Sequence, residues 1–151
     1  MISNKKIPVL IVCDPWADDM FALVWALIMH KKWFIDIVAI TTSWGNVPAL
    51  VTCENAKRAC TMTWVKTKIW QWGDDNWAGN AAHIHGEDWI WGLSHHLSID
   101  NNLVVEESTN LIKENIDKFG KELRIVATWP LTNFAKLEKS YPWTLKNAKE
   151  I

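Results

Sequence analysis

Short apolar runs alternate along the chain with longer segments in which apolar residues recur at helical spacing. The short runs are typical of strands buried in a parallel sheet, and they lie at residues 7–12, 35–41, 67–70 and 123–127. The longer segments predict helices at residues 18–31, 47–61, 104–119 and 131–140. Because strands alternate with helices, we expect right-handed βαβ units and an α/β fold with a mostly parallel sheet.

Polar residues mark the ends of these predicted elements. Asp18 is the expected N-cap of the first helix, and Gly120 is expected to close the helix at 104–119. Residues 71–99 are polar, rich in aromatic residues and only weakly periodic, and a loop of that length is usually functional or contains short helices. Ligands of parallel α/β folds bind at the carboxyl ends of the strands. The candidate functional segments are therefore residues 13–19, 42–47, 71–93 and 128–133.

Composition excludes several classes of protein. The 16 Lys and Arg residues nearly balance the 17 Asp and Glu residues, so the chain offers no basic footprint for nucleic acid or for an anionic membrane surface. The longest apolar run, residues 20–29, is shorter than the roughly 20 residues of a membrane span. Cys13, Cys53 and Cys60 form no metal-binding or disulfide pattern. We therefore expect a cytoplasmic protein with a single domain over residues 1–151.

Three carboxylates, Asp14, Asp18 and Asp19, follow the first predicted strand within six residues. Like charges at this spacing repel one another unless a cation or a helix N-terminus compensates them. A helix with acidic residues in its first turn is the simpler interpretation. Carboxylate oxygens also suit a hard cation, calcium or magnesium. The position at the end of a strand favours a site.

The other strand ends carry further candidates, each with a structural alternative. Asn46 precedes the second predicted helix, so it is either the N-cap of that helix or an amide that binds a sugar hydroxyl. The carbonyl group of Thr128 lies at a strand end, where it is free to coordinate a cation. His83 and His85 are either solvated loop residues or, for a histidine near a cleft, a general acid.

Together, four of these strand-end segments resemble the signatures of the inosine-uridine-preferring nucleoside hydrolase family. They are Val12-Cys13-Asp14-Pro15-Trp16-Ala17-Asp18-Asp19, Thr-Thr-Ser-Trp-Gly-Asn-Val at 41–47, Ala-His-Ile-His-Gly-Glu-Asp at 82–88, and Ala-Thr-Trp-Pro-Leu-Thr-Asn at 127–133. One such motif would be weak, whereas four in order at strand ends are specific. The resemblance covers nearly the whole chain but about the N-terminal half of a family member. It therefore implies a Rossmann-like fold that is truncated.

The resemblance implies calcium-dependent hydrolysis of the N-glycosidic bond of ribonucleosides, to ribose and free base. By motif position, Asp14 would be a metal ligand and the general base, and Asp19 and the Thr128 carbonyl would be further Ca²⁺ ligands. Asp18 and Asn46 would bind ribose hydroxyls. The resemblance leaves open whether the protein prefers purine or pyrimidine nucleosides and whether it forms homo-oligomers.

By the same resemblance, His85 would lie near the leaving base. Two departures from the family pattern favour an alternative. Val12 stands where the family has an aspartate, and the later half of the family, which supplies a further aspartate ligand, has no counterpart in the chain. The alternative is a non-catalytic fragment or remnant that binds a divalent cation or ribose weakly. A third hypothesis is an interaction module that uses the tryptophan-rich stretch 70–91 as an aromatic contact surface.

Tryptophan and glycine are present in inverted amounts, with 12 Trp and 6 Gly. Glycine alone usually makes up about 7% of a protein. Trp16 and Trp129 stand where the family pattern has glycine, and several other tryptophans lie in turn-like segments. One hypothesis explains both observations: the gene uses a code in which UGA specifies glycine, and its UGA codons have been translated as tryptophan.

Overall fold

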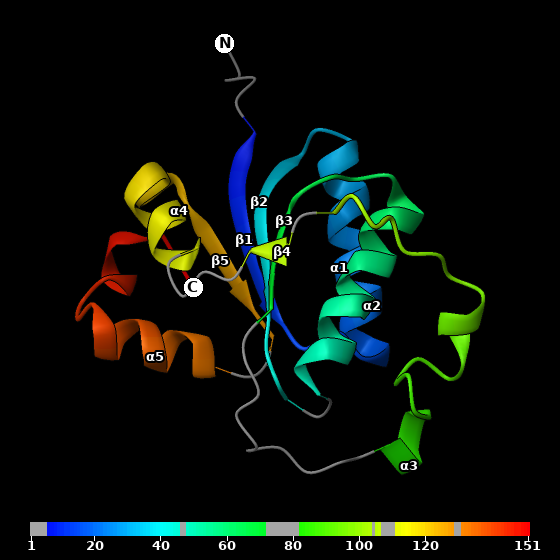
Figure 1. Cartoon of the computed structure of the whole chain (residues 1–151). Helices are drawn as coiled ribbons and strands as arrows, with labels where there is room; N and C mark the ends of the chain where they lie inside the picture. The colour runs from blue at the N-terminus through cyan, green and yellow to red at the C-terminus, as the bar shows by residue number, and fades with distance from the viewer. Residues whose placement is uncertain (1–5, 46–47, 72–81, 104, 107–110, 129–130) are drawn as a thin grey trace.

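A parallel sheet forms the centre of the computed structural model, which describes residues 6–45, 48–71, 82–103, 105–106, 111–128 and 131–151 (Figure 1). Within these residues the sheet has five strands in the order β4-β3-β2-β1-β5, and every pairing is parallel. The strands are β1 (Ile7–Cys13), β2 (Ile35–Thr42), β3 (Lys68–Gln71), β4 (Val105–Glu106) and β5 (Arg124–Ala127). The predicted α/β fold with a mostly parallel sheet is confirmed.

Helices cover both faces of the sheet. Two of them, α1 (Ala17–Lys31) and α2 (Ala49–Thr63), pack on one face, and α4 (Leu111–Phe119) and α5 (Thr132–Ser140) pack on the other (Figure 1). The helix α3 (Ala82–His85) lies beyond the sheet, and three single 3₁₀ turns occupy Leu93–His95, Gly120–Glu122 and Leu145–Asn147. No helix in the described part of the chain combines the length and the apolar character that crossing a bilayer requires.

Alternation along the central strand β1 supplies two cores. Val9, Ile11 and Cys13 pack with residues of α1 and α2, whereas Leu10 and Val12 pack with residues of α4 and α5. All of these side chains are buried, as expected for a strand that is covered on both faces. The carboxyl end of β1 is therefore fixed by packing on both faces. This packing also fixes where the turn after β1 begins.

All three cysteines are free thiols in the core. Burial raises the pKa of the Cys53 thiol to about 11 and that of Cys60 to about 12. Burial, with the nearby charges of Asp19 and Asp14, also raises the pKa of Cys13 well above its ordinary value. Each thiol therefore stays protonated at neutral pH.

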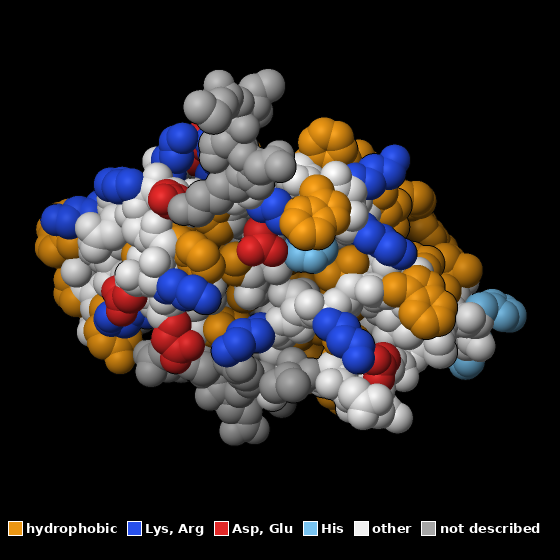
Figure 2. All heavy atoms as spheres, turned by 90° about the horizontal axis from the view of Figure 1, so that it is seen from above, with side chains coloured by type: hydrophobic (Ala, Val, Ile, Leu, Met, Phe, Trp, Pro, Cys, Tyr) orange, Lys and Arg blue, Asp and Glu red, His pale blue; other side chains and the backbone are white. Residues whose placement is uncertain are grey.

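The face at the amino ends of the strands carries charges of both signs. Figure 2 shows Lys and Arg side chains interspersed with Asp, Glu and large hydrophobic groups on this face. This mixture fits the nearly balanced composition.

Two local predictions were wrong. Asp18 is not the N-cap of α1, because the helix begins at Ala17 and Trp16 occupies the cap position. The single helix predicted at 104–119 is instead the short strand β4 followed by α4 from Leu111. Val105 pairs with Ile69 of β3 and extends the sheet, a tertiary contact that local helical periodicity does not report.

Candidate functional site

The turn between β1 and α1 brings two carboxylates together. Asp14 directly follows β1 and is fully buried, and Asp19 lies in the first turn of α1 and is also buried. The backbone N–H of Asp14 donates a hydrogen bond to Oδ2 of Asp19 over 3.1 Å. The end of a core strand and the start of a helix thus fix the pair without any contribution from a long loop.

Thr128, which follows β5, joins this pair from the neighbouring strand. Its hydroxyl Oγ1 donates to Oδ2 of Asp19 over 2.8 Å, and its N–H donates to the carbonyl oxygen of Val12 over 3.0 Å. Burial raises the pKa of Asp19, although hydrogen bonds from Thr128 and from Asp14 oppose the shift. Three of the predicted site residues, Asp14, Asp19 and Thr128, therefore lie together at one edge of the sheet.

Gly45 is a site residue to which sequence analysis assigned no role. It lies in the turn after β2, and a Cβ atom at this position would stand only 1.9 Å from Oδ2 of Asp14. Only glycine lets the backbone of this turn approach the buried carboxylate so closely. The sequence offered one indication of this role, since Gly45 is the glycine of the motif at 41–47. The close approach of Gly45 to Asp14, however, depends on how β1 and β2 pair.

Of the two predicted ribose ligands, the structure describes Asp18 but not Asn46. Asp18 is exposed beside the buried pair, and its Oδ1 accepts a hydrogen bond from the N–H of Asp19 over 2.9 Å. Asn46 lies outside the described residues. Helix α2 begins at Ala49 with Pro48 at the cap position, so the alternative interpretation of Asn46 as the N-cap of this helix was wrong.

His85 ends α3 and lies half-buried between two indole rings. Its imidazole meets Trp16 edge-on at 4.6 Å between ring centroids, and it meets Trp91 in the same way at 4.8 Å. Its Nδ1 is buried and has no hydrogen-bond partner among the described residues. Trp16 lies two residues after Asp14, so this contact brings His85 to the turn that carries the carboxylates.

A second residue that sequence analysis missed, Asn55 of α2, ties these parts together. The side chain is fully buried, and its Nδ2 donates to the carbonyl oxygens of Pro15, over 2.9 Å, and of Asp88, over 3.1 Å. Its Oδ1 accepts a hydrogen bond from Arg58 over 3.2 Å. One amide therefore connects the β1–α1 turn to the segment that follows α3, across 40 and 33 residues of sequence.

The carboxylate of Asp88 organises the segment after α3. It accepts hydrogen bonds from the backbone N–H groups of Gly92, Ser94 and Ile90 over 2.9, 2.8 and 3.2 Å. Partial burial alone would raise the pKa of Asp88, but these hydrogen bonds outweigh it and lower the pKa to about 2. The charged form of Asp88 thus holds the turn that leads from His85 to the 3₁₀ helix at Leu93–His95.

The oxygen donors at the β1 edge fit part of a calcium shell. The buried pair of carboxylates is a site of like charge that a divalent cation would stabilise, and Thr128 adds a neighbouring oxygen. Calcium takes 6–8 oxygen ligands, so substrate hydroxyls, water or other residues must complete such a shell. No group of three or more His, Cys, Asp or Glu residues in the described part of the chain is arranged to hold a metal ion.

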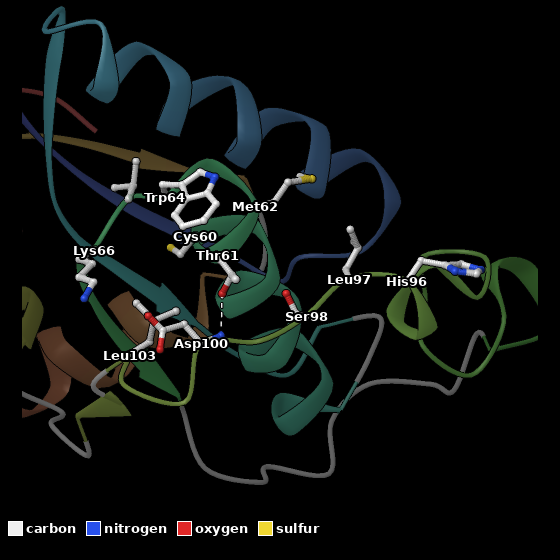
Figure 3. A pocket seen from close by; sticks show the side chains of 11 residues that line it. Cys60, Thr61, Met62, Trp64, Lys66, His96, Leu97, Ser98, Asp100 and Leu103 are labelled. Carbon is white, nitrogen blue, oxygen red and sulfur yellow. Dashed lines mark hydrogen bonds between the residues drawn. The ribbon is translucent and has the colours of Figure 1, made fainter.

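A prominent hollow lies away from these carboxylates. It has a volume of about 450 Å³, and its lining includes Cys60, Trp64, His96, Asp100 and Leu103 (Figure 3). Its lining runs along the stretch that leads into the amino end of β3, whereas the Asp14 cluster lies at the carboxyl ends of the strands. The hollow and the candidate site therefore lie at opposite ends of the strands.

The described tryptophans of the 70–91 stretch do not form a continuous exposed surface. Trp70 packs in the core at 3% exposure and Trp89 is 1% exposed, whereas Trp91 is exposed. The hypothesis of an aromatic contact surface over this stretch was therefore wrong for two of the three tryptophans that the structure describes there.

The sequence matches a known family and its curated members. The family model described as "Inosine-uridine preferring nucleoside hydrolase" matches residues 9–151. The chain is 30% identical over 149 residues to the pyrimidine-specific ribonucleoside hydrolase RihA of Escherichia coli O9:H4, covering 90% of this chain and 44% of that protein. It is also 30% identical over 145 residues to the RihA of a Shewanella species, covering 89% of this chain and 42% of the relative. The chain thus spans less than half the length of these relatives.

Solved structures share the fold. A plant nucleoside hydrolase, PpNRh1, superposes with a TM-score of 0.79 at 25% identity, covering 96% of this chain and 46% of that one. A purine-preferring ribonucleoside hydrolase from Gardnerella vaginalis superposes with a TM-score of 0.77 at 22% identity, covering 94% and 46% of the two chains.

Proposed function

Because the chain belongs to the inosine-uridine preferring nucleoside hydrolase family, we propose that it takes part in hydrolysis of the N-glycosidic bond of ribonucleosides. The observation that carries this proposal is the buried pair of Asp14 and Asp19, held by Thr128 at the carboxyl ends of β1 and β5. Parallel α/β folds bind their ligands at this edge. The chain spans 44% of the Escherichia coli relative, so the proposal concerns the part of the site that these residues form.

Asp14 is the proposed general base. In the reaction the bond between C1′ of ribose and the base nitrogen breaks, the oxygen of a water molecule bonds to C1′, and the departing base takes up a proton. A carboxylate oxygen of Asp14 would accept the proton that the attacking water loses. The transition state has oxocarbenium character, as in glycoside hydrolysis, so the negative charge of the Asp14–Asp19 pair would also stabilise it.

Ca²⁺ is the proposed cofactor, with Asp14, Asp19 and the Thr128 carbonyl as its ligands. When bound, the cation would orient a water molecule and lower its pKa. The Thr128 hydroxyl has a separate role, because its hydrogen bond to Oδ2 fixes the Asp19 side chain.

Substrate contacts fall to the residues around this pair. Exposed Asp18 would accept hydrogen bonds from ribose hydroxyls, and Asn46 is the second proposed ribose ligand. His85 would face the base and donate the proton that the base requires on departure. Asn55 would position His85 relative to Asp14, because its amide binds the backbone on both sides.

Substitution of the buried carboxylates tests the proposal. In the purified chain supplied with Ca²⁺, we expect Asp14→Asn to lower the release of free base from inosine or uridine by about 10²–10⁴-fold, the range that a general base contributes. Asp117→Asn is the matched control, since Asp117 is an exposed carboxylate of α4 on the far face of the sheet. Chromatography of the released base measures both. Unchanged turnover in Asp14→Asn contradicts the proposal.

Calorimetric titration with Ca²⁺ tests the cofactor separately. We expect binding to the unsubstituted chain and to Asp117→Asn, and loss of binding in Asp19→Asn. If the chain binds Ca²⁺ through Asp19 but releases no base from either nucleoside, the non-catalytic alternative replaces the hydrolase. Equal binding by all three proteins rejects Asp19 as a ligand.

A further inference from the structure

Tryptophan occupies every left-handed backbone position that is not glycine in the described part of the chain. The residues with positive φ are three glycines and five tryptophans; the tryptophans are Trp33, Trp64, Trp89, Trp91 and Trp143, with φ from 55° to 69°. A left-handed backbone costs an L-residue with a bulky side chain free energy that glycine does not pay. Asn and Asp adopt this conformation more easily than Trp does, yet none of the described Asn or Asp residues is found there.

Two of the five tryptophans stand at helix ends that are built for glycine. Trp33 follows α1, and its N–H donates to the oxygen of His30 while the next N–H, of Phe34, donates to the oxygen of Met29. Trp64 follows α2 with the same pair of hydrogen bonds, to residues three and five positions back. This is the Schellman motif, whose left-handed position is usually glycine because glycine has no Cβ.

Two more lie in the segment after α3. Trp89 and Trp91 alternate with residues of ordinary conformation between Gly86 and Gly92, which are themselves left-handed. The indole of Trp91 packs against one edge of His85 while Trp16 packs against another. By the motif resemblance, Trp16 and Trp129 stand where the family pattern has glycine, although Trp129 lies outside the described residues. The backbone conformation and the motif resemblance thus point to different tryptophans, and both indicate that glycine suits the positions concerned.

We propose that the protein made in its own cell carries glycine at Trp16, Trp33, Trp64, Trp89, Trp91, Trp129 and Trp143, because the UGA codons of its gene are decoded as glycine. Glycine at positions 16 and 91 removes the two indoles that flank His85 and opens the candidate site around it. Glycine at position 64 removes one wall of the 450 Å³ hollow, because the Trp64 side chain lines it (Figure 3).

The remaining described tryptophans do not carry the proposal. Trp25 lies inside α1, Trp44 follows β2, and Trp70 packs in the core from within β3. None of the three has positive φ. They serve as internal references, because they show that tryptophan as a residue type does not by itself lead to a left-handed backbone in this structure.

Peptide masses of the protein isolated from its own cells test the proposal directly. Trypsin releases residues 59–66, 125–136 and 140–146 as three peptides that each contain one tryptophan position, Trp64, Trp129 and Trp143. We expect each peptide to be lighter than the tryptophan form by the mass difference between a tryptophan residue and a glycine residue, and each corresponding codon to be UGA. A tryptophan mass or a UGG codon at any of the three positions overturns the proposal.

A matched pair of variants tests the physical argument in the chain as translated here. Trp64 and Trp25 are both exposed, at 85% and 64%, but only Trp64 is left-handed. We expect Trp64→Gly to raise the midpoint of thermal unfolding and Trp25→Gly to lower it, since glycine relieves strain at the first position and weakens a helix at the second. A fall of the midpoint in both variants would show that Trp64 suits its backbone, and it would overturn the structural case. Neither test depends on hydrolase activity.

Discussion

The β1–α1 turn and the segment after α3 contribute to one candidate site by different physical means. The turn is an extension of the core, because Asp14 follows a strand that is packed on both faces and Asp19 lies in the first turn of a long helix. The segment after α3 has little regular structure, and two polar side chains, Asn55 and Asp88, hold its backbone. Strand and helix packing positions the first region, whereas in the second the hydrogen bonds of Asn55 and Asp88 add to the packing of buried Trp89 and Ile90.

This difference teaches where each region is vulnerable. A tightly packed region tolerates little added volume. A region held by hydrogen bonds to a carboxylate loses its order when a donor or the charge is removed. Substitutions that add volume, remove an amide or remove a charge therefore separate the two regions.

The largest expected effect is that of added volume at Gly45. Gly45→Ala places a methyl group 1.9 Å from Oδ2 of Asp14, so we expect a loss of about 3 kcal/mol in the free energy of unfolding, the upper end for overpacking. Gly86→Ala is the comparison in the other region. Its Cβ has room, with the nearest atom at 3.7 Å, and only its φ of 84° is unfavourable, so about 1 kcal/mol is expected. Urea unfolding of both variants measures this; equal losses would show that space at Gly45 is not limiting.

The next effect is that of the amide that joins the regions. Asn55→Ala leaves the carbonyl oxygens of Pro15 and Asp88 without their donor, so we expect a loss of about 2 kcal/mol. Hydrogen exchange locates it: the N–H groups of Gly92 and Ser94 should exchange faster, because Asn55 anchors their segment. Asn147→Ala, at an exposed position far from both regions, should change neither quantity. Unaltered exchange at Gly92 and Ser94 in Asn55→Ala would show that Asp88 holds its segment alone.

The smallest effect is on pH dependence. The pKa of Asp88 is about 2 in the folded protein and about 4 in an unfolded chain, so its contribution to stability is present above about pH 4 and is lost as the pH falls toward 2. Asp88→Asn should therefore be less stable than the parent at pH 5.5, and the difference should shrink at pH 3. Urea midpoints of the two proteins at both pH values measure this. A difference that is constant with pH would contradict the role of the charge.

Sequence patterns predicted the elements whose signal is local. Continuous apolar runs predicted β1 and β2, and four strand-end motifs predicted that Asp14, Asp19 and Thr128 meet. The pattern around Val105 failed, because a two-residue strand is defined by its pairing with β3 and not by its own periodicity.

Contacts between distant segments were beyond the sequence. Nothing in a single sequence reports that the amide of Asn55 binds a carbonyl group 40 residues away, or that Gly45 lies against Asp14. Such contacts depend on how α2 and the two strands pack. The inverted counts of Trp and Gly are an exception, since the excess of tryptophan in the composition agrees with the five tryptophans that have positive φ.

The three buried cysteines allow the opening of the folded protein to be followed by thiol alkylation. Because Cys13, Cys53 and Cys60 lie in the core with raised pKa values, the folded state offers no thiolate to an alkylating reagent. Labelling requires the sheet and α2 to separate, so at saturating reagent its rate reports how often the molecule opens. The kinetic stability of any variant of the site can thus be ranked from its alkylation rate, without introducing a further cysteine or a fluorescent label.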